Sequence, residues 1–171
     1  MSLSIGEPAP TFTLPAVGGG EEGFGGDAAA VVVFTCNHCP YALAWHDRIL
    51  DAARDADVPF LLINPNDAER YPRDSFEAMQ ERVDEDGGWP VPYLRDEDQS
   101  VARAFGAKTT PDVFVIGTDG RLAYRGAPDA DHRDPSQRAQ WLRAALEAVT
   151  SGRAPTPAET KPIGCSVKWK A

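Results

Sequence analysis

A pair of closely spaced cysteines between two very different stretches of sequence constrains this chain most. An apolar, β-branched run over 30–35 ends at Cys36-Asn37-His38-Cys39-Pro40. Such a run is typical of a strand covered on both faces of an α/β sheet. Beyond the motif, apolar positions recur every three or four residues from Leu43 to Ala53, which predicts an amphipathic helix. The cysteines therefore stand where a buried strand passes into a helix.

The next segments extend an α/β pattern. A second apolar run over 58–64 predicts a strand parallel to the first, because a helix separates the two. Asp74 is expected to cap a helix that continues to Asp86. Two prolines exclude 89–94 from the interior of a sheet. A short helix is expected over 96–106.

The second half predicts a hairpin and a closing helix. The runs 112–116 and 122–124 flank Thr118-Asp119-Gly120, a strong hairpin signal. Asp134-Pro135-Ser136-Gln137 predicts a helix start with Asp134 as its cap. The resulting order is that of an α/β, thioredoxin-like fold, with a central mixed sheet flanked by helices. It carries an N-terminal extension and an insertion before the hairpin.

The last segment alternates as a half-buried strand does. Ile163, Cys165, Val167 and Trp169 fall on one side, which predicts a strand-like tail that docks on the rest of the chain. We therefore expect a thioredoxin-like domain over 1–152 and a docking tail over 153–171. The 171 residues suffice for one domain with a hydrophobic core.

The cysteine spacing favours redox chemistry. A thiol at a helix N-terminus is stabilised as thiolate, so we expect Cys36 to attack, to be the more exposed thiol and to have the lower pKa. Cys39, one turn on, would resolve the mixed disulfide, and a protonated His38 would tune the thiolate. Structural zinc uses the same spacing but usually needs four ligands, and no second matching pair exists. A metal site or an inert pair stays the minor alternative.

Two further residues belong to the predicted site. Pro111 precedes a strand at the position where the thioredoxin fold places a cis-proline facing the dithiol, so we expect a cis Thr110–Pro111 bond there. Cys165 leaves two interpretations open. Its tail is long enough to bring a resolving thiol to the dithiol, and a small buried hydrophobic residue explains it equally well.

Several of these segments resemble the redoxin class of thioredoxin-like proteins. The segments that resemble the class as a whole are Cys36-Asn37-His38-Cys39-Pro40-Tyr41, Thr110-Pro111 and Thr118-Asp119-Gly120-Arg121. Those that resemble its peroxiredoxin-like, AhpC/TSA-related subgroup are Gly6-Glu7-Pro8-Ala9-Pro10 and Gly164-Cys165-Ser166-Val167-Lys168-Trp169. The resemblance implies a thiol–disulfide oxidoreductase with an antioxidant or redox-homeostasis role and a docking groove at Pro111.

The resemblance leaves two alternatives open, a thiol peroxidase and a non-catalytic binding or metal-carrying module. Peroxiredoxins resemble one another in a Thr ahead of the reactive Cys and a distant Arg. Matching Cys39 to that Cys puts Cys36 at the Thr position, and Pro111-Asp112 stand near the expected Arg. Disulfide exchange is therefore favoured over peroxide reduction.

Charge and composition limit the partners. The net charge of −9 disfavours nucleic-acid binding, and no run is long and apolar enough to span a membrane. The first residues lack a secretory pattern, so we expect a cytoplasmic protein, monomeric or homodimeric. Expected partners are thiol or disulfide protein substrates and a thiol reductant, with no cofactor and no metal. The chain has 16 Asp and only 4 Lys, which suggests adaptation to high salt.

Overall fold

The computed structural model describes residues 3–171 and centres on a five-stranded mixed sheet. The strand order is β5-β4-β3-β7-β8. The strands are β3 (Ala30–Phe34), β4 (Phe60–Asn64), β5 (Tyr93–Arg95), β7 (Asp112–Ile116) and β8 (Leu122–Gly126). Strands β3, β4 and β5 run parallel, whereas β7 pairs antiparallel with β3 and β8. The predicted thioredoxin-like α/β fold is thus confirmed.

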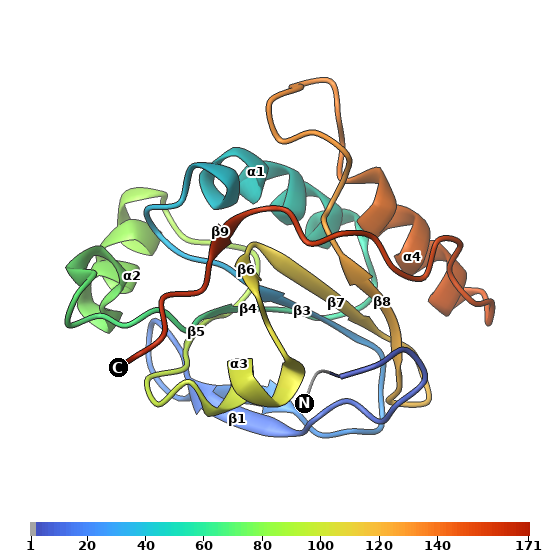
Figure 1. Ribbon diagram of the computed structural model, residues 1–171, viewed down its shortest axis with the longest axis horizontal. Helices are drawn as coiled ribbons and strands as arrows, with labels where there is room; N and C mark the ends of the chain where they lie inside the picture. Colours follow the sequence, from blue (N-terminus) through green and yellow to red (C-terminus); the bar gives the residue numbers. More distant parts are fainter. Residues whose placement is uncertain (1–2) are drawn as a thin grey trace.

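Strand β3 alternates between two cores. Val31 and Val33 pack beneath α1 (Pro40–Asp55), α2 (Phe76–Glu85) and α4 (Gln140–Thr150). Val32 and Phe34 face α3 (Ser100–Phe105) and the hairpin of β1 (Phe12–Pro15) and β2 (Glu21–Phe24). Figure 1 shows α1 and α4 on one side of the sheet and α3 and β1 on the other. Both faces of β3 are therefore buried, as its unbroken apolar run predicts.

The insertion between β4 and β7 contains η1 (Pro72–Asp74), α2, β5 and α3. Strand β5 lies at the sheet edge, in agreement with the two prolines that precede it. The predicted cap of α2 is wrong by one residue. Ser75 is the N-cap, and its Oγ accepts a hydrogen bond from the Ala78 N–H at 3.1 Å. Asp74 instead turns inward, where its carboxylate is fully buried.

The predicted start of α4 is also wrong, since the helix begins at Gln140. Asp134 binds within its own turn, accepting from the Ser136 N–H at 2.9 Å. The Asp134 carbonyl accepts from Arg48 at 2.8 Å. Ala139 has a φ of 55°, which is outside the helical region, and donates to Asp129 at 2.9 Å. These tertiary contacts hold 134–139 as a loop.

The tail docks as a strand. β9 (Cys165–Ser166) pairs antiparallel with β6 (Thr109–Thr110), and Figure 1 shows the C-terminal segment crossing beside β6. Val167 is buried, while Ile163, Cys165 and Trp169 are only partly covered. The alternation therefore predicts the strand, although only one of its four side chains joins the core.

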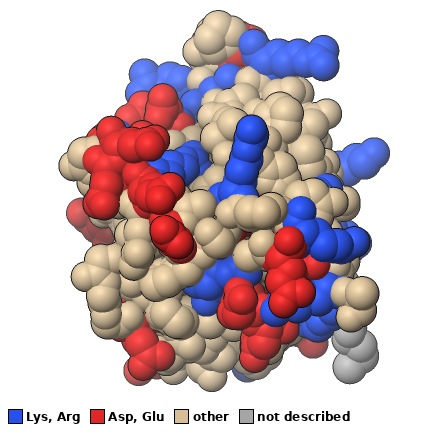
Figure 2. All heavy atoms as spheres, turned by 90° about the vertical axis from the view of Figure 1, so that its left-hand side faces the viewer, with Lys and Arg blue, Asp and Glu red and all other residues tan. Residues whose placement is uncertain are grey.

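The acidic side chains are unevenly distributed over the surface. Figure 2, which looks onto the side where α2 lies, shows acidic side chains gathered in groups with lysines and arginines between them. Across residues 3–171, none of the helices combines the length and apolar character that crossing a membrane requires.

Candidate functional site

The two motif cysteines lie in the loop from β3 to α1, and both side chains are fully buried. The helix begins at Pro40, so Cys39 is its N-cap and Cys36 stands three residues earlier. This differs from the expectation that Cys36 occupies the helix start and is the more exposed thiol. The first-turn N–H groups and the positive end of the helix dipole therefore lie nearer Cys39.

Thr110 contacts both sulfurs from the opposite side. Its Oγ1 lies 3.3 Å from Cys36 Sγ, and its carbonyl oxygen lies 3.3 Å from Cys39 Sγ. The Thr110–Pro111 peptide bond is cis, which confirms that expectation. The described residues also contain a second cis bond, Thr156–Pro157, for which no expectation was made.

The surroundings divide the two thiols electrostatically. The pKa of Cys39 is lowered to about 4, mainly because its sulfur accepts a hydrogen bond from the Cys36 thiol. Burial acts in the opposite direction, and hydrogen bonds from the Cys165 thiol and nearby backbone N–H groups lower the pKa further. The partnership with Cys39 and burial raise the pKa of Cys36 well above its ordinary value, and the Asp74 carboxylate contributes. The thiolate of the pair thus belongs on Cys39.

Asp74 is the site residue that sequence reasoning missed as such. Its Oδ2 lies 2.6 Å from His38 Nδ1, and the His38 ring stacks on Tyr71 with centroids 5.4 Å apart. The carboxylate also accepts from the Asn37 N–H (2.7 Å) and from the side-chain amides of Asn64 (3.1 Å) and Asn66 (3.0 Å). One signal points to this cluster: Asn64 ends a parallel strand beside the one that leads to Cys36.

A second set of contacts fixes the loop between the cysteines. Arg82 donates to the Cys36 carbonyl at 3.1 Å and to Asn37 Oδ1 at 2.8 Å. The buried Tyr93 hydroxyl donates to the same Asn37 oxygen at 2.7 Å. The insertion, which supplies Asp74, Arg82 and Tyr93, therefore holds the dithiol loop in place.

Cys165 lies beside the dithiol on the docked tail. It stands opposite Thr110 in the β6–β9 register and packs against the buried cysteine cluster. Its pKa is raised to about 11 by burial and by its hydrogen bond to Cys39, so it is a protonated thiol at neutral pH. The structure therefore brings all three cysteines to one place.

Metal ligation has partial support in the geometry. Ligand atoms of Cys36, His38 and Asp74 lie within 4.8 Å of one another. Asp74 is already engaged by amide donors and by His38, which leaves it poorly suited to coordinate an ion. His46 packs on Trp89 and His132 on Tyr41, apart from this group.

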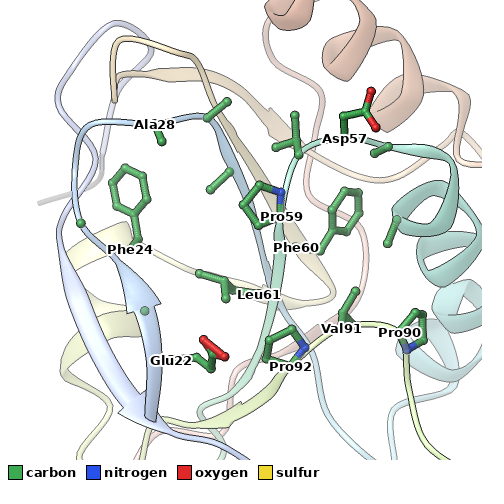
Figure 3. Close-up of a pocket in the computed structure, with 17 residues that line it drawn as sticks. Glu22, Phe24, Ala28, Asp57, Pro59, Phe60, Leu61, Pro90, Val91 and Pro92 are labelled. Carbon is green, nitrogen blue, oxygen red and sulfur yellow. The ribbon is translucent and has the colours of Figure 1, made fainter.

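A large hollow lies elsewhere. About 550 Å³ opens at the N-terminal ends of β3 and β4, between the β1–β2 hairpin and 90–92 (Figure 3). The cysteines follow the C-terminal end of β3, so this hollow lies at the opposite end of the sheet. It has no part in the dithiol site.

The comparisons with known proteins concern the family and the fold. The model of the redoxin family matches residues 4–141. The chain belongs to the redoxin family. An uncharacterized conserved protein from Geobacillus kaustophilus has a similar structure, with a TM-score of 0.91 at 38% identity, over 98% of this redoxin and 93% of its own chain. A search of curated proteins found no match.

Two solved structures of known class share the fold of this redoxin. A peroxidoxin from Mycobacterium tuberculosis has a TM-score of 0.66 at 18% identity, covering 86% of this chain and 98% of its own. A secreted disulfide oxidoreductase from the same organism has a TM-score of 0.61 at 19% identity, covering 80% and 95%. At these identities the likeness concerns the fold.

Proposed function

We propose that this redoxin is a thiol–disulfide oxidoreductase whose reactive groups are Cys36 and Cys39. The observation that carries the proposal is that the two sulfurs lie together: both contact Thr110, and the Cys36 thiol hydrogen-bonds to Cys39. A stabilised thiolate beside a protonated thiol is the state that attacks a disulfide and then closes to a new one.

The proposed order of attack reverses the sequence-based expectation. The Cys39 thiolate attacks a disulfide sulfur brought into contact with it, forming a mixed disulfide and releasing the other sulfur as a thiolate. The Cys36 sulfur then attacks Cys39, its proton passes to the sulfur that leaves Cys39, and a Cys36–Cys39 disulfide remains. A separate dithiol reductant restores the pair. Pro111 is proposed to shape the groove, and His38 to tune the dithiol through its contact with Asp74.

Peroxide reduction is the second candidate, and the lowered pKa of Cys39 favours it. A thiolate at a helix N-cap is also the species that attacks a peroxide. Against it, among residues 3–171 no arginine side chain donates a hydrogen bond to either sulfur; Arg82 binds the Cys36 backbone, and Arg125 pairs with Asp112 at 3.1 Å. A metal-carrying role has only the partial cluster described above.

The test compares two oxidants on the same reduced protein. Reduced protein is mixed with glutathione disulfide or with hydrogen peroxide, and the Cys36–Cys39 disulfide is followed by peptide mass mapping. We expect glutathione disulfide to oxidise the protein faster than hydrogen peroxide does. The Cys36→Ser/Cys39→Ser variant should form no disulfide between these positions. Faster oxidation by peroxide, through a sulfenic acid on Cys39, would assign the protein to the peroxidases instead.

A further inference from the structure

The burial of the dithiol poses a problem of access. Cys36 and Cys39 are each 0% exposed, so an external disulfide has no direct path to either sulfur. Thiol–disulfide exchange requires contact between the attacking sulfur and the disulfide. Among the three cysteines, only Cys165 is partly exposed. Any exchange in this conformation must therefore begin at Cys165.

The tail places Cys165 between solvent and the dithiol. Strand β9 lies along β6 with Cys165 opposite Thr110, the residue that contacts both buried sulfurs. A Cβ added at Gly164 would meet the Thr110 carbonyl oxygen at 2.4 Å and the Pro111 nitrogen at 3.3 Å. The tail backbone thus lies directly against Thr110 and Pro111 and fills the groove expected there.

The residues that follow β9 hold the tail in this position through backbone hydrogen bonds. The Val167 N–H donates to the Lys108 carbonyl at 3.1 Å, and the Lys168 N–H donates to Asn66 Oδ1 at 2.9 Å. The Lys170 N–H donates to Gln99 Oε1 at 3.0 Å. The thiol of Cys165 is therefore positioned beside Cys39 by a fixed strand.

We propose that Cys165 is a third redox-active thiol, through which the buried Cys36–Cys39 pair exchanges electrons with disulfides in solution. The inference rests on the proposed function and names the residue that meets its substrate. That substrate is a disulfide whose sulfur can reach the partly exposed β9, carried by a small molecule or by a protein loop.

The exchange proceeds in three steps that balance. Cys165 loses its proton to solvent, its sulfur attacks a disulfide RSSR′, and R′S⁻ leaves and takes a proton from solvent. The Cys39 thiolate then attacks Cys165 sulfur, forming a Cys39–Cys165 disulfide and releasing RS⁻. Finally Cys36 attacks Cys39 and its proton passes to Cys165. The substrate is reduced to two thiols, while Cys36 and Cys39 are oxidised to a disulfide.

The test follows thiol linkages in the full chain, with glutathione disulfide as the probe. In the Cys165→Ser variant we expect the Cys36–Cys39 disulfide to form more slowly, on the order of tenfold or more, because the positioned entry thiol is gone. The Cys165→Ser/Ser166→Cys variant keeps a thiol on the strand but turns it to the opposite face. It should be as slow, whereas thermal unfolding should show both variants folded.

A second variant traps the intermediate and does not depend on rates. Cys36→Ser should accumulate a Cys39–Cys165 disulfide, identified by peptide mapping. The proposal is overturned if Cys165→Ser oxidises at the wild-type rate, or if Cys36→Ser carries glutathione on Cys165 without passing it to Cys39. In either case a normal Cys36–Cys39 disulfide in the wild-type protein leaves the proposed function standing. Its absence there would contradict the proposed function and the inference together.

Discussion

Asp74 shapes the dithiol loop through a fully buried carboxylate. It accepts hydrogen bonds from the Asn37 backbone and from two asparagine side chains, and it contacts His38 at 2.6 Å. Both oxygens of this carboxylate accept hydrogen bonds, so replacing one of them by an amide NH2 leaves a buried donor facing another donor.

The first prediction concerns that carboxylate. Asp74→Asn places an amide among donors, so we expect the free energy of unfolding to fall by about 3 kcal/mol. We also expect the pKa of Cys36 to fall, since the Asp74 charge raises it. Urea denaturation measures the first effect, and the ultraviolet absorbance of the thiolate followed against pH measures the second. Asp47→Asn, at an exposed site on α1, is the control and should change neither quantity.

His46 supplies a prediction on pH. Its side chain is only 7% exposed, and burial lowers its pKa to about 4 from an unfolded value of about 6.5. Between these values the unfolded chain binds the proton more readily, so stability is lost as the pH falls from 6.5 towards 4.

The measurement compares unfolding free energies of the wild type and His46→Gln from pH 7 to pH 4. The wild type should lose on the order of 3 kcal/mol more than the variant over this range. Burial raises the pKa of Asp112 to about 6, which acts in the opposite sense, but both proteins contain it and the comparison removes it. Equal pH slopes in the two proteins would contradict the assignment.

At the scale of elements, the contact between β9 and β6 depends on a glycine. Gly164→Ala would bring a methyl group to 2.4 Å from the Thr110 carbonyl oxygen. The tail would have to move to relieve this steric clash. We expect a loss of about 1–3 kcal/mol in stability, as for overpacked sites. Hydrogen exchange should show a less protected Val167 amide. Gly25→Ala, where the nearest atom lies at 3.8 Å, should leave both unchanged.

The whole tail is predicted to stabilise the domain it docks on. Val167 is 3% exposed and belongs to the core beneath β3, and burying such a side chain contributes about 1.5–3 kcal/mol. Deleting 153–171 should therefore lower the melting temperature measured by circular dichroism. An unchanged melting temperature would mean that the cost of ordering the tail cancels its contacts.

At the scale of the molecule, the net charge of −9 predicts a dependence on salt. Acidic side chains gather in groups on the face shown in Figure 2, so their mutual repulsion weakens as screening increases. We expect the melting temperature to rise from low to molar sodium chloride. Sodium chloride is the salt for this test because sulfate stabilises proteins generally, independently of charge screening. A flat profile would contradict the suggestion of adaptation to high salt.

Much of the fold follows from local patterns in the sequence. The apolar runs at β3, β4 and β7, the Asp119-Gly120 turn and the stripe on α1 predict their elements because strand and helix periods are written in neighbouring residues. The position of the dithiol after a buried strand follows in the same way. The predicted order of elements extends this to the cis bond before Pro111.

Other features were decided by contacts between distant segments. The start of α4 moved to Gln140 because Arg48 and Asp129 hold the preceding loop. Local capping rules cannot register such partners, since they depend on the packing of α1 against 129–139.

The site divides along the same line. The sequence by itself determined that two cysteines meet at a strand–helix junction, and that the tail alternates as a strand. Only the tertiary structure decided that Cys39 is the helix N-cap, that Asp74 faces the motif from the insertion, and that Cys165 lies beside Cys39. The reason is physical: periodicity is local, whereas burial and the pKa values of thiols depend on groups brought together by folding.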